Sequence, residues 1–264
     1  MRRGVASPSS RHGRPLHCDV SGSGSPVVLL HGVAFGPESF THLTRERSGS
    51  SLQFVAPHRR GYGRSVDLPL ADDLDVQVAD IIATIEAEVE SPVVIAGVSG
   101  GATLALAVAL AHPGLVRRLV LHEPAIGPLG PSLAAILTGS ADAFARADDV
   151  RVPAVSLAKT LAGPTTWSRL DARSGVERMA ATMAHEVPQF AAFAPSTGDL
   201  MRLRALPVVS SVGRDSGPER YEVSRALIVC AEAVEVALPC GHLAQVEAPQ
   251  AFAAAIAMEV EPTR

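Results

Sequence analysis

Short apolar segments alternate along this chain of 264 residues with longer segments in which apolar residues recur at helical spacing. The short segments are rich in valine, isoleucine and leucine, and comprise Pro26–Leu30, Leu52–Ala56, Val93–Ala96, Leu119–Leu121, Val208–Val212 and Val234–Leu238. Strands separated by helices are typical of parallel sheets, because each parallel connection must cross from one end of the sheet to the other. The pattern therefore predicts an α/β fold with a mostly parallel sheet covered by helices.

Two of the longer segments are predicted to be helices from their spacing and their ends. The first contains Val76, Val78, Ile81, Ile82, Ile85 and Val89 at helical spacing, behind Asp72, Asp73 and Asp75, which can cap its start. The second, Ala102–Ala111, stops at His112-Pro113-Gly114, where proline cannot continue a helix and glycine permits the exit turn. We expect both helices to pack on the sheet.

The region from Ala125 to Ala205 interrupts the alternation, because it is rich in alanine, contains several prolines and has no clear strand. We therefore predict a helical cap at residues 125–205, inserted between a first core segment at 1–124 and a second at 206–264. Its larger apolar side chains either line a pocket beneath the cap or hold the cap helices together. They are Trp167, Met179, Met183, Phe190 and Phe193.

Composition and charge exclude several classes of protein. Hydrophobic residues make up 47% of the chain and charged residues 19%, which is the balance of an ordinary folded domain. A net charge of −4 and an aromatic content of 4% argue against binding to nucleic acid. The apolar stretches are broken by glycine and small polar residues before they reach the length of a membrane span, so we expect no membrane insertion.

The cysteines and the amino-terminal residues suggest neither a disulfide framework nor an export signal. Cys18, Cys230 and Cys240 are widely spaced and odd in number, so we expect free thiols and no metal site. Met1–Ser10 lacks the apolar core of a secretory signal, and we expect a cytoplasmic protein.

The sequence Gly97-Val98-Ser99-Gly100-Gly101 follows a predicted strand and precedes a predicted helix. This G-x-S-x-G pattern in this context indicates a nucleophile elbow, in which a sharp turn exposes the serine hydroxyl above the sheet. A phosphate-binding loop would also lie between a strand and a helix, but neither G-x-G-x-x-G nor G-x-x-x-x-G-K-[ST] is present. We therefore predict that Ser99 is a nucleophile and that the Gly100 N–H stabilises an oxyanion.

A second oxyanion donor is expected in the loop after a neighbouring strand, because two N–H groups must converge on one oxygen. The strand ending at Leu30 is followed by His31-Gly32-Val33-Ala34, and we predict the N–H of Val33, with Ala34 as the alternative. His31 is expected to organise this loop, since such a site needs only one catalytic histidine.

The histidine predicted to act as general base is His242, which follows the last predicted strand in the loop Pro239-Cys240-Gly241-His242. Serine is a poor nucleophile until a base removes its proton, and a neutral imidazole suits that task near neutral pH.

In this order, the motifs resemble those of the α/β-hydrolase family, and the resemblance covers nearly the full length of the chain. It rests on Leu29-Leu30-His31-Gly32, on PHRRGYGRS at Pro57–Ser65, on the elbow around Ser99 and on Gly241-His242. The resemblance implies a doubly wound sheet with an inserted helical cap. One departure is His58, where the family usually has an aspartate in a structural role.

Two residues, Glu123 and Asp215, are candidates for the acidic member of the site, and each lies at the end of a predicted strand. The family pattern after the later strand is G-x-x-D, but here the acid comes one residue early and Ser216 holds the expected place. Glu123 resembles the acid of α/β-hydrolases that carry it after the preceding strand. We favour Glu123, because a shift of one residue on a tight turn redirects the side chain.

The resemblance implies a serine esterase that cleaves a carboxylic ester, lactone or thioester of a small, partly apolar molecule through an acyl-serine, without a cofactor. An amidase, a C–C hydrolase or a cofactor-free perhydrolase could use the same machinery. A cyclase or a ligand-binding receptor of the same fold is the non-hydrolytic alternative. Epoxide hydrolases and haloalkane dehalogenases of this fold carry an aspartate at the elbow, so Ser99 argues against both.

Overall fold

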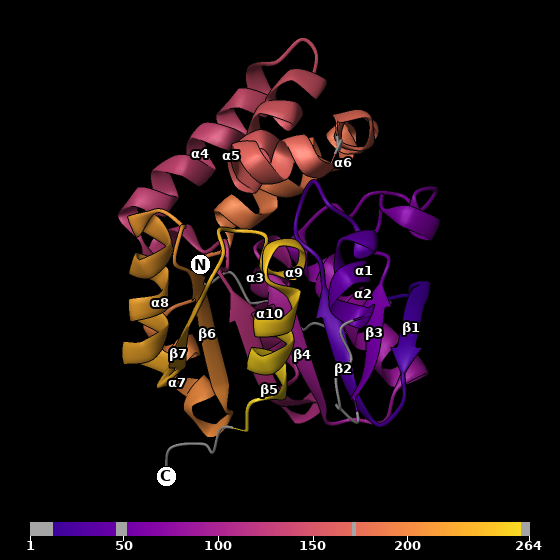
Figure 1. Cartoon of the computed structure of the whole chain (residues 1–264), viewed down its shortest axis with the longest axis vertical. Coiled ribbons are helices and arrows are strands. Elements are labelled where there is room, and N and C mark those ends of the chain that lie inside the picture. Colours follow the sequence, from indigo (N-terminus) through magenta and orange to yellow (C-terminus); the bar gives the residue numbers. More distant parts are fainter. Residues whose placement is uncertain (1–12, 46–51, 171–172, 260–264) are drawn as a thin grey trace, which may run out of the picture.

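Seven strands form a single sheet in the computed structural model of the chain (Figure 1), which describes residues 13–45, 52–170 and 173–259. They are β1 (Cys18–Gly22), β2 (Ser25–Leu30), β3 (Leu52–Pro57), β4 (Val93–Val98), β5 (Val116–His122), β6 (Val208–Gly213) and β7 (Val234–Leu238), in the spatial order β1-β3-β2-β4-β5-β6-β7. All neighbours pair in parallel except β1 and β3. The predicted mostly parallel sheet is confirmed. The expectation about Met1–Ser10 lies outside the described residues.

The helices cover both faces of this sheet, as expected for a doubly wound fold. They are α1 (Thr41–Arg45), α2 (Leu74–Glu88), α3 (Gly100–Ala111), α4 (Pro131–Arg146), α5 (Arg151–Leu170), α6 (Arg173–Ala192), α7 (Thr197–Arg202), α8 (Pro218–Ala231), α9 (Ala244–Glu247) and α10 (Pro249–Ala257). The apolar residues of α2, α3 and α8 pack on one face, and those of α1, α9 and α10 pack on the other. The side chain of Asp73 accepts a hydrogen bond from the Val76 N–H and caps α2, as the aspartate cluster predicted.

Burial on both faces explains why the central strands are continuous apolar runs. In β2, Val28 and Leu30 face the first group of helices, whereas Val27 and Leu29 face the second. Successive side chains of a strand point to opposite faces, so a strand covered on both sides must be apolar at every position. The edge strand β1 lacks this signal, because it is short, polar and partly exposed, and the apolar pattern did not predict it.

Helices α4, α5 and α6 lie above the edge of the sheet where the parallel strands end (Figure 1). Their shared apolar cluster includes Phe144, Val176 and Met183, and it also contains Val33 and Leu243 from loops at the sheet edge. The helix that follows them, α7, packs against α8 instead. The described structure thus has a helical layer over the strand ends, while the exact boundaries at 125 and 205 stay a prediction.

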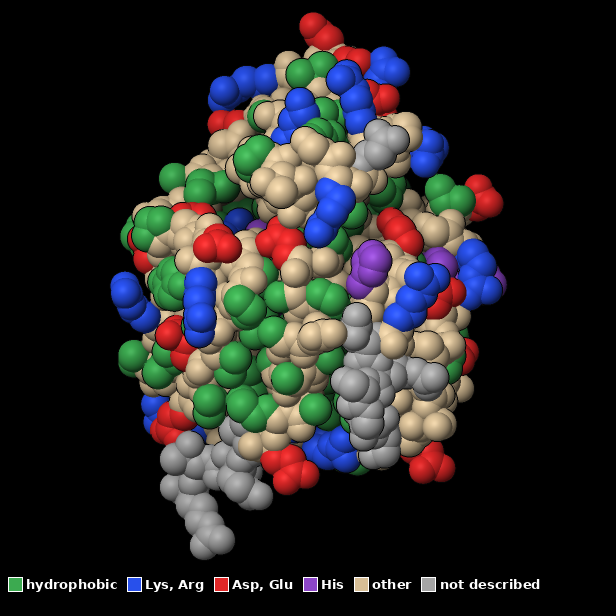
Figure 2. All heavy atoms as spheres, in the orientation of Figure 1, with side chains coloured by type: hydrophobic (Ala, Val, Ile, Leu, Met, Phe, Trp, Pro, Cys, Tyr) green, Lys and Arg blue, Asp and Glu red, His purple; other side chains and the backbone are tan. Residues whose placement is uncertain are grey.

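The outer tip of this layer, where α4 and α5 meet, carries charges of both signs (Figure 2). Arg146 pairs with Asp142 at 2.9 Å and Arg151 pairs with Asp149 at 2.7 Å, all on exposed side chains. Exposed ion pairs contribute little to stability. These pairs lie within the layer, whereas its apolar underside packs on the loops of the core.

His58 occupies the position where the family usually has an aspartate, in the loop after β3. Its buried ring accepts a hydrogen bond through Nδ1 from the Arg64 N–H at 2.9 Å, and this bond closes the loop onto itself. A ring nitrogen thus does here what a carboxylate oxygen could do, which agrees with a structural role for this position.

Candidate active site

Ser99 is the residue between β4 and α3, and its backbone has φ 55° and ψ −124°. Few residues other than glycine adopt a positive φ, and such strain concentrates at functional sites. The turn is tight because glycines let the strand and helix cross closely. A Cβ atom on Gly97 would lie 2.4 Å from the Gly101 oxygen, and one on Gly101 would lie 2.1 Å from the Leu30 oxygen. This geometry is that of a nucleophile elbow.

His242 and Glu123 form a short hydrogen bond in which Nδ1 and Oε2 are 2.6 Å apart, and both side chains are buried. An ionised carboxylate only accepts hydrogen bonds, so Nδ1 carries the proton and Nε2 keeps its lone pair. Within the described residues, Nε2 of His242 is buried without a hydrogen-bond partner. The other oxygen of Glu123 accepts from the Gly213 N–H at 2.8 Å, which fixes the carboxylate.

The charges around this pair favour a neutral imidazole and an ionised carboxylate. Burial lowers the pKa of His242 and the positive charge of Arg220 lowers it further, which together outweigh the opposing effect of Glu123. Burial opposes ionisation of Glu123, but the hydrogen bond from His242, and the positive charge of that ring once low pH has protonated it, hold the pKa of Glu123 well below the usual carboxyl range. At neutral pH the ring is thus in the state that accepts a proton.

Asp215, the other candidate acid, lies on an exposed turn after β6. Its N–H donates to the Cys240 oxygen at 3.0 Å, but its side chain makes no hydrogen bond or ion pair within the described residues. The register of the sheet does not decide between the two acids, because β5, β6 and β7 are neighbouring parallel strands and both acids follow strands that end at the same edge. The side-chain contacts decide, since the buried carboxylate of Glu123 reaches Nδ1 of His242. The structure brings Glu123, and not Asp215, into contact with His242.

Two further buried side chains adjoin the pair, and the sequence analysis did not single them out. Nε of Arg220, in the first turn of α8, lies 3.7 Å from Oε2 of Glu123 and 3.7 Å from Oε1 of Glu219. His122 hydrogen bonds Ser211 at 3.1 Å, and burial lowers its pKa to about 4. Neither residue belongs to a recognisable spacing pattern, and only the sheet register and the start of α8 bring them here.

The predicted oxyanion donors lie beside Ser99. Val33 and Gly100 line the same small cavity as Ser99, with a volume of about 40 Å³. A Cβ atom on Gly32 would lie 3.1 Å from the Cβ of Ser99, so the loop passes very close to the elbow. The N–H of Gly100 is at the amino end of α3, where helix N–H groups lack intrahelical acceptors. These positions suit two donors that converge on one oxygen.

A larger cavity of about 350 Å³ lies on the other side of the pair and is lined by Glu123, His242 and Arg220. The two cavities share apolar side chains of the helical layer, namely Ile136, Leu157 and Leu161. Of the five apolar cap residues named from the sequence, Phe190 lines the cavity beside Ser99. Met183 is buried in the cluster of α4 to α6, and Trp167 packs against that cluster.

Within the described residues, no group of three or more His, Cys, Asp or Glu side chains is arranged to hold a metal ion. The three cysteines are free thiols. No helix of residues 13–45, 52–170 and 173–259 combines the length and apolar character needed to cross a bilayer.

Comparison with known proteins gives partial matches to curated enzymes and a full-length match in fold. The chain is 29% identical over 160 residues to Lipase LipV of Mycobacterium tuberculosis, which covers 59% of this chain and 57% of the lipase. It is 33% identical over 99 residues to the non-heme chloroperoxidase of Streptomyces lividans, which covers 37% and 36% of the two chains. The matches thus span little more than half of one relative and about a third of the other.

Solved structures extend the likeness to the whole fold. A thermophilic esterase from Thermogutta terrifontis superposes with a TM-score of 0.73 over 91% of each chain, at 20% identity. At that identity the likeness concerns the fold alone. The sequence model of the alpha/beta hydrolase family matches residues 27–255, which takes in every strand except β1 and the start of β2, as well as the elbow, Glu123 and His242. The chain therefore belongs to the alpha/beta hydrolase family.

Proposed function

We propose that this protein is a serine hydrolase that cleaves a carboxylic ester, lactone or thioester of a small, partly apolar molecule. The observation that carries the proposal is the buried Nε2 of His242, whose lone pair has no partner in the described residues while Nδ1 donates to Glu123. Nε2 is not hydrogen bonded to Ser99 in this structure, so the proposed reaction requires the serine hydroxyl to come within reach of it. A histidine held by a carboxylate and a serine on a strained turn are the two parts that activate a hydroxyl group.

In the acylation step, Oγ of Ser99 attacks the carbonyl carbon of the substrate as Nε2 of His242 takes the hydroxyl proton. The carbonyl oxygen becomes an oxyanion, which accepts hydrogen bonds from the N–H groups of Val33 and Gly100. Glu123 stabilises the imidazolium that forms. The imidazolium then returns its proton to the leaving oxygen or sulfur, and the bond to the leaving group breaks.

In the deacylation step, water replaces the leaving group. His242 takes a proton from this water, the hydroxide attacks the acyl carbon, and a second oxyanion forms on the same two donors. The bond to Oγ breaks as Ser99 regains a proton, and a carboxylic acid leaves. No cofactor takes part in this sequence.

The proposed substrate class follows from the lining of the two cavities. Their volumes of about 350 and 40 Å³ suit a small molecule, and Ile136, Leu157 and Leu161 give them an apolar wall. Burial of an apolar acyl or alcohol group there would place the scissile carbonyl between Ser99 and the oxyanion donors. Similarity to a lipase over 160 residues supports ester chemistry.

The test is turnover of a panel of p-nitrophenyl esters, thioesters and lactones by the wild type and two serine variants. Ser99→Ala should lower kcat by at least about 10³-fold, because nucleophile and base act as a unit. Ser168→Ala is the matched control, since Ser168 is exposed on α5, lines neither cavity and hydrogen bonds the Pro164 oxygen of its own helix. It should stay within about 3-fold of the wild type. A fluorophosphonate should label Ser99, as located by mass spectrometry.

Two outcomes would change the proposal. Tight binding of esters without turnover or labelling would favour a ligand-binding receptor or a cyclase. Faster peracid formation than hydrolysis in the presence of hydrogen peroxide would favour a perhydrolase, in which peroxide takes the place of water on the acyl-serine. The partial similarity to a non-heme chloroperoxidase is the reason for including this arm.

A further inference from the structure

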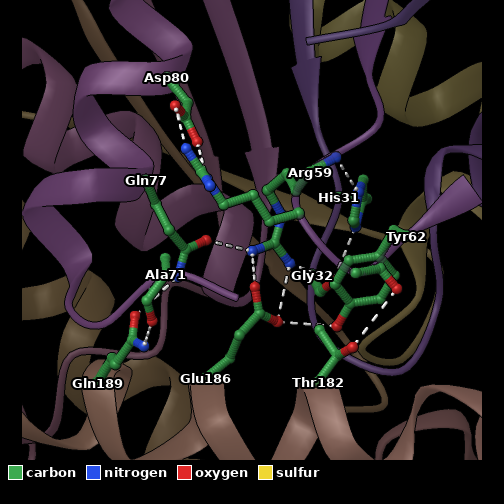
Figure 3. A network of polar contacts seen from close by, with 12 residues as sticks. His31, Gly32, Arg59, Tyr62, Ala71, Gln77, Asp80, Thr182, Glu186 and Gln189 are labelled. Atoms are coloured by element: carbon green, nitrogen blue, oxygen red, sulfur yellow. Dashed lines mark hydrogen bonds and ion pairs between the residues drawn. The ribbon is translucent and has the colours of Figure 1, made fainter. Parts of the chain in front are cut away.

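A buried ion pair joins the core to the helical layer outside the candidate catalytic residues (Figure 3). Arg59, in the loop after β3, pairs with Glu186 of α6, and both side chains are almost fully buried. Glu186 contacts Nη1 and Nη2 of Arg59 and also accepts from the hydroxyl of Tyr62 at 2.8 Å. Gln77 of α2 accepts from Nη1 of Arg59 at 2.8 Å. The guanidinium is thereby fixed from two sides.

The same guanidinium reaches the loop of the proposed oxyanion donor. Nη2 of Arg59 donates to the carbonyl oxygen of Gly32 at 2.9 Å. That carbonyl and the N–H of Val33 belong to one planar peptide group, in which the C=O and N–H bonds point in opposite directions. A donor that holds the Gly32 oxygen on one side therefore sets the direction of the Val33 N–H on the other.

His31 supports the same peptide. Its Nδ1 lies 3.0 Å from the Gly32 oxygen, and its Nε2 accepts from the Arg59 N–H at 3.4 Å. Burial and the charge of Arg59 lower the pKa of this ring well below the ordinary value, so it is a neutral donor of one hydrogen bond. The charged donor on the Gly32 oxygen is thus Arg59 alone among the described residues.

The pairing also explains why the cap carries Glu186. A guanidinium buried without a counterion is costly, and this one is balanced by a carboxylate from α6. Neither Arg59 nor Glu186 lines the two cavities beside Ser99 and His242. The Gly32–Val33 peptide is thus the polar route by which this pair reaches the reaction, beside a contact of the guanidinium with the ring of Phe190, which lies 5.9 Å away and lines the cavity beside Ser99.

We infer that Arg59 is a positioning residue that aims the Val33 N–H at the oxyanion, and that Glu186 makes this aim depend on docking of the cap. The inference rests on the proposed function, because it concerns the oxyanion of that reaction. A charged donor also polarises the peptide and strengthens its N–H as a donor. A stronger and well-directed N–H stabilises the oxyanion of the transition state more than the neutral carbonyl of the bound substrate. Loss of Arg59 should therefore change kcat more than KM.

The experiment compares Arg59→Met with Arg60→Met on the best ester of the panel. Arg60 is the matched control, because it forms the neighbouring pair with Asp80 of α2 and makes no contact with the Gly32 peptide. We expect Arg59→Met to lower kcat about 10- to 100-fold, which is less than the loss caused by deleting an oxyanion donor outright. Its KM should stay within about 3-fold of the wild-type value. Arg60→Met should leave kcat within about 3-fold.

A second measurement separates a change in the direction of the Val33 N–H from a loss of protein stability. A trifluoromethyl ketone adds to the serine and forms an oxyanion, so its inhibition constant should rise by the same factor as kcat/KM falls in Arg59→Met. If Arg59→Met does not fold, Glu186→Gln serves instead. It should lose about 3- to 10-fold in kcat, because an amide oxygen accepts a weaker hydrogen bond from Arg59 than a carboxylate does.

The outcomes distinguish the two proposals. Equal losses of kcat in Arg59→Met and Arg60→Met, or an unchanged inhibition constant, would overturn the role of Arg59 while leaving the hydrolase intact. A wild-type protein that neither hydrolyses an ester nor binds the ketone would overturn the proposed function, and this inference with it.

Discussion

Replacing Glu123 by glutamine exchanges one carboxylate oxygen for an NH₂ group and should move the ring proton of His242 from Nδ1 to Nε2. The amide oxygen can still accept from the Gly213 N–H, which is 2.8 Å from the carboxylate in the structure. The amide nitrogen would then face Nδ1 of His242, where the carboxylate oxygen is now 2.6 Å away. An amide NH₂ only donates, so Nδ1 must become the acceptor. The ring proton moves to Nε2, and His242 can no longer take a proton from Ser99.

The expected loss is about 10³- to 10⁴-fold in kcat, the size of effect that a wrong histidine tautomer produces in such sites. Folding should suffer less. Loss of one charge-assisted hydrogen bond costs about 1.5–3 kcal/mol, against a total stability of about 5–15 kcal/mol for a typical protein. The variant should therefore be folded at 25 °C, and its inactivity should not arise from unfolding.

The assay is the initial rate on an ester that the wild type hydrolyses, with circular dichroism and urea unfolding to check the fold. Asp215→Asn is the matched control, because the same change of carboxylate to amide is made on an exposed side chain that forms no hydrogen bond or ion pair with the described residues. It should stay within about 3-fold of the wild type. A loss of about 10³-fold in Asp215→Asn, with Glu123→Gln near normal, would refute the assignment of the acid.

Three further predictions concern protonation and packing. In a pH–rate profile, the rate should rise with pH through a midpoint below 6.5, because His242 must be neutral to accept a proton and its pKa is lowered. Arg220→Met should move that midpoint upward, because the charge of Arg220 lowers this pKa. Buried neutral His122 binds its proton near pH 4 when folded and near 6.5 when unfolded, so stability should fall by about 3 kcal/mol as pH drops through this window. Urea unfolding at several pH values should show a smaller slope in His122→Asn than in the wild type, and the remaining slope comes from other buried histidines such as His31 and His242. Gly97→Ala should destabilise by at least about 3 kcal/mol, since its Cβ would lie 2.4 Å from a backbone oxygen, whereas Gly139→Ala, with open space, should be neutral or stabilising.

The sequence predicted the parts of the fold that depend on local pattern. Strands buried on both faces must be apolar throughout, and this made the central strands visible. The strand β1 was missed because an exposed edge strand needs no apolar run, and Cys18–Gly22 has none. Its position depends on pairing with β3, a contact that no local spacing encodes.

The candidate site also contains residues that a local sequence pattern indicates and residues that only tertiary contacts reveal. Ser99 and His242 carry local signatures, a glycine-flanked turn and a Gly-His loop after a strand, and could be named from the sequence. The choice of acid stayed open because both candidates follow parallel strands at the same edge of the sheet, and only the side-chain contact of Glu123 with His242 separates them. Arg59 and Glu186 are 127 positions apart, and neither stands in a motif that indicates the other. Only the docking of α6 on the core reveals their pairing.

The exposed turn after β6 has a consequence for how this enzyme could be altered. A turn that supplied the acid would have to hold a carboxylate at hydrogen-bond distance from the histidine, and this would restrict its sequence. Here Glu123, at the end of β5, contacts His242, so the exposed Asp215 lines the larger cavity without contacting the histidine. Substitutions confined to Asp215 should change which molecules enter that cavity and leave the contact between Glu123 and His242 in place.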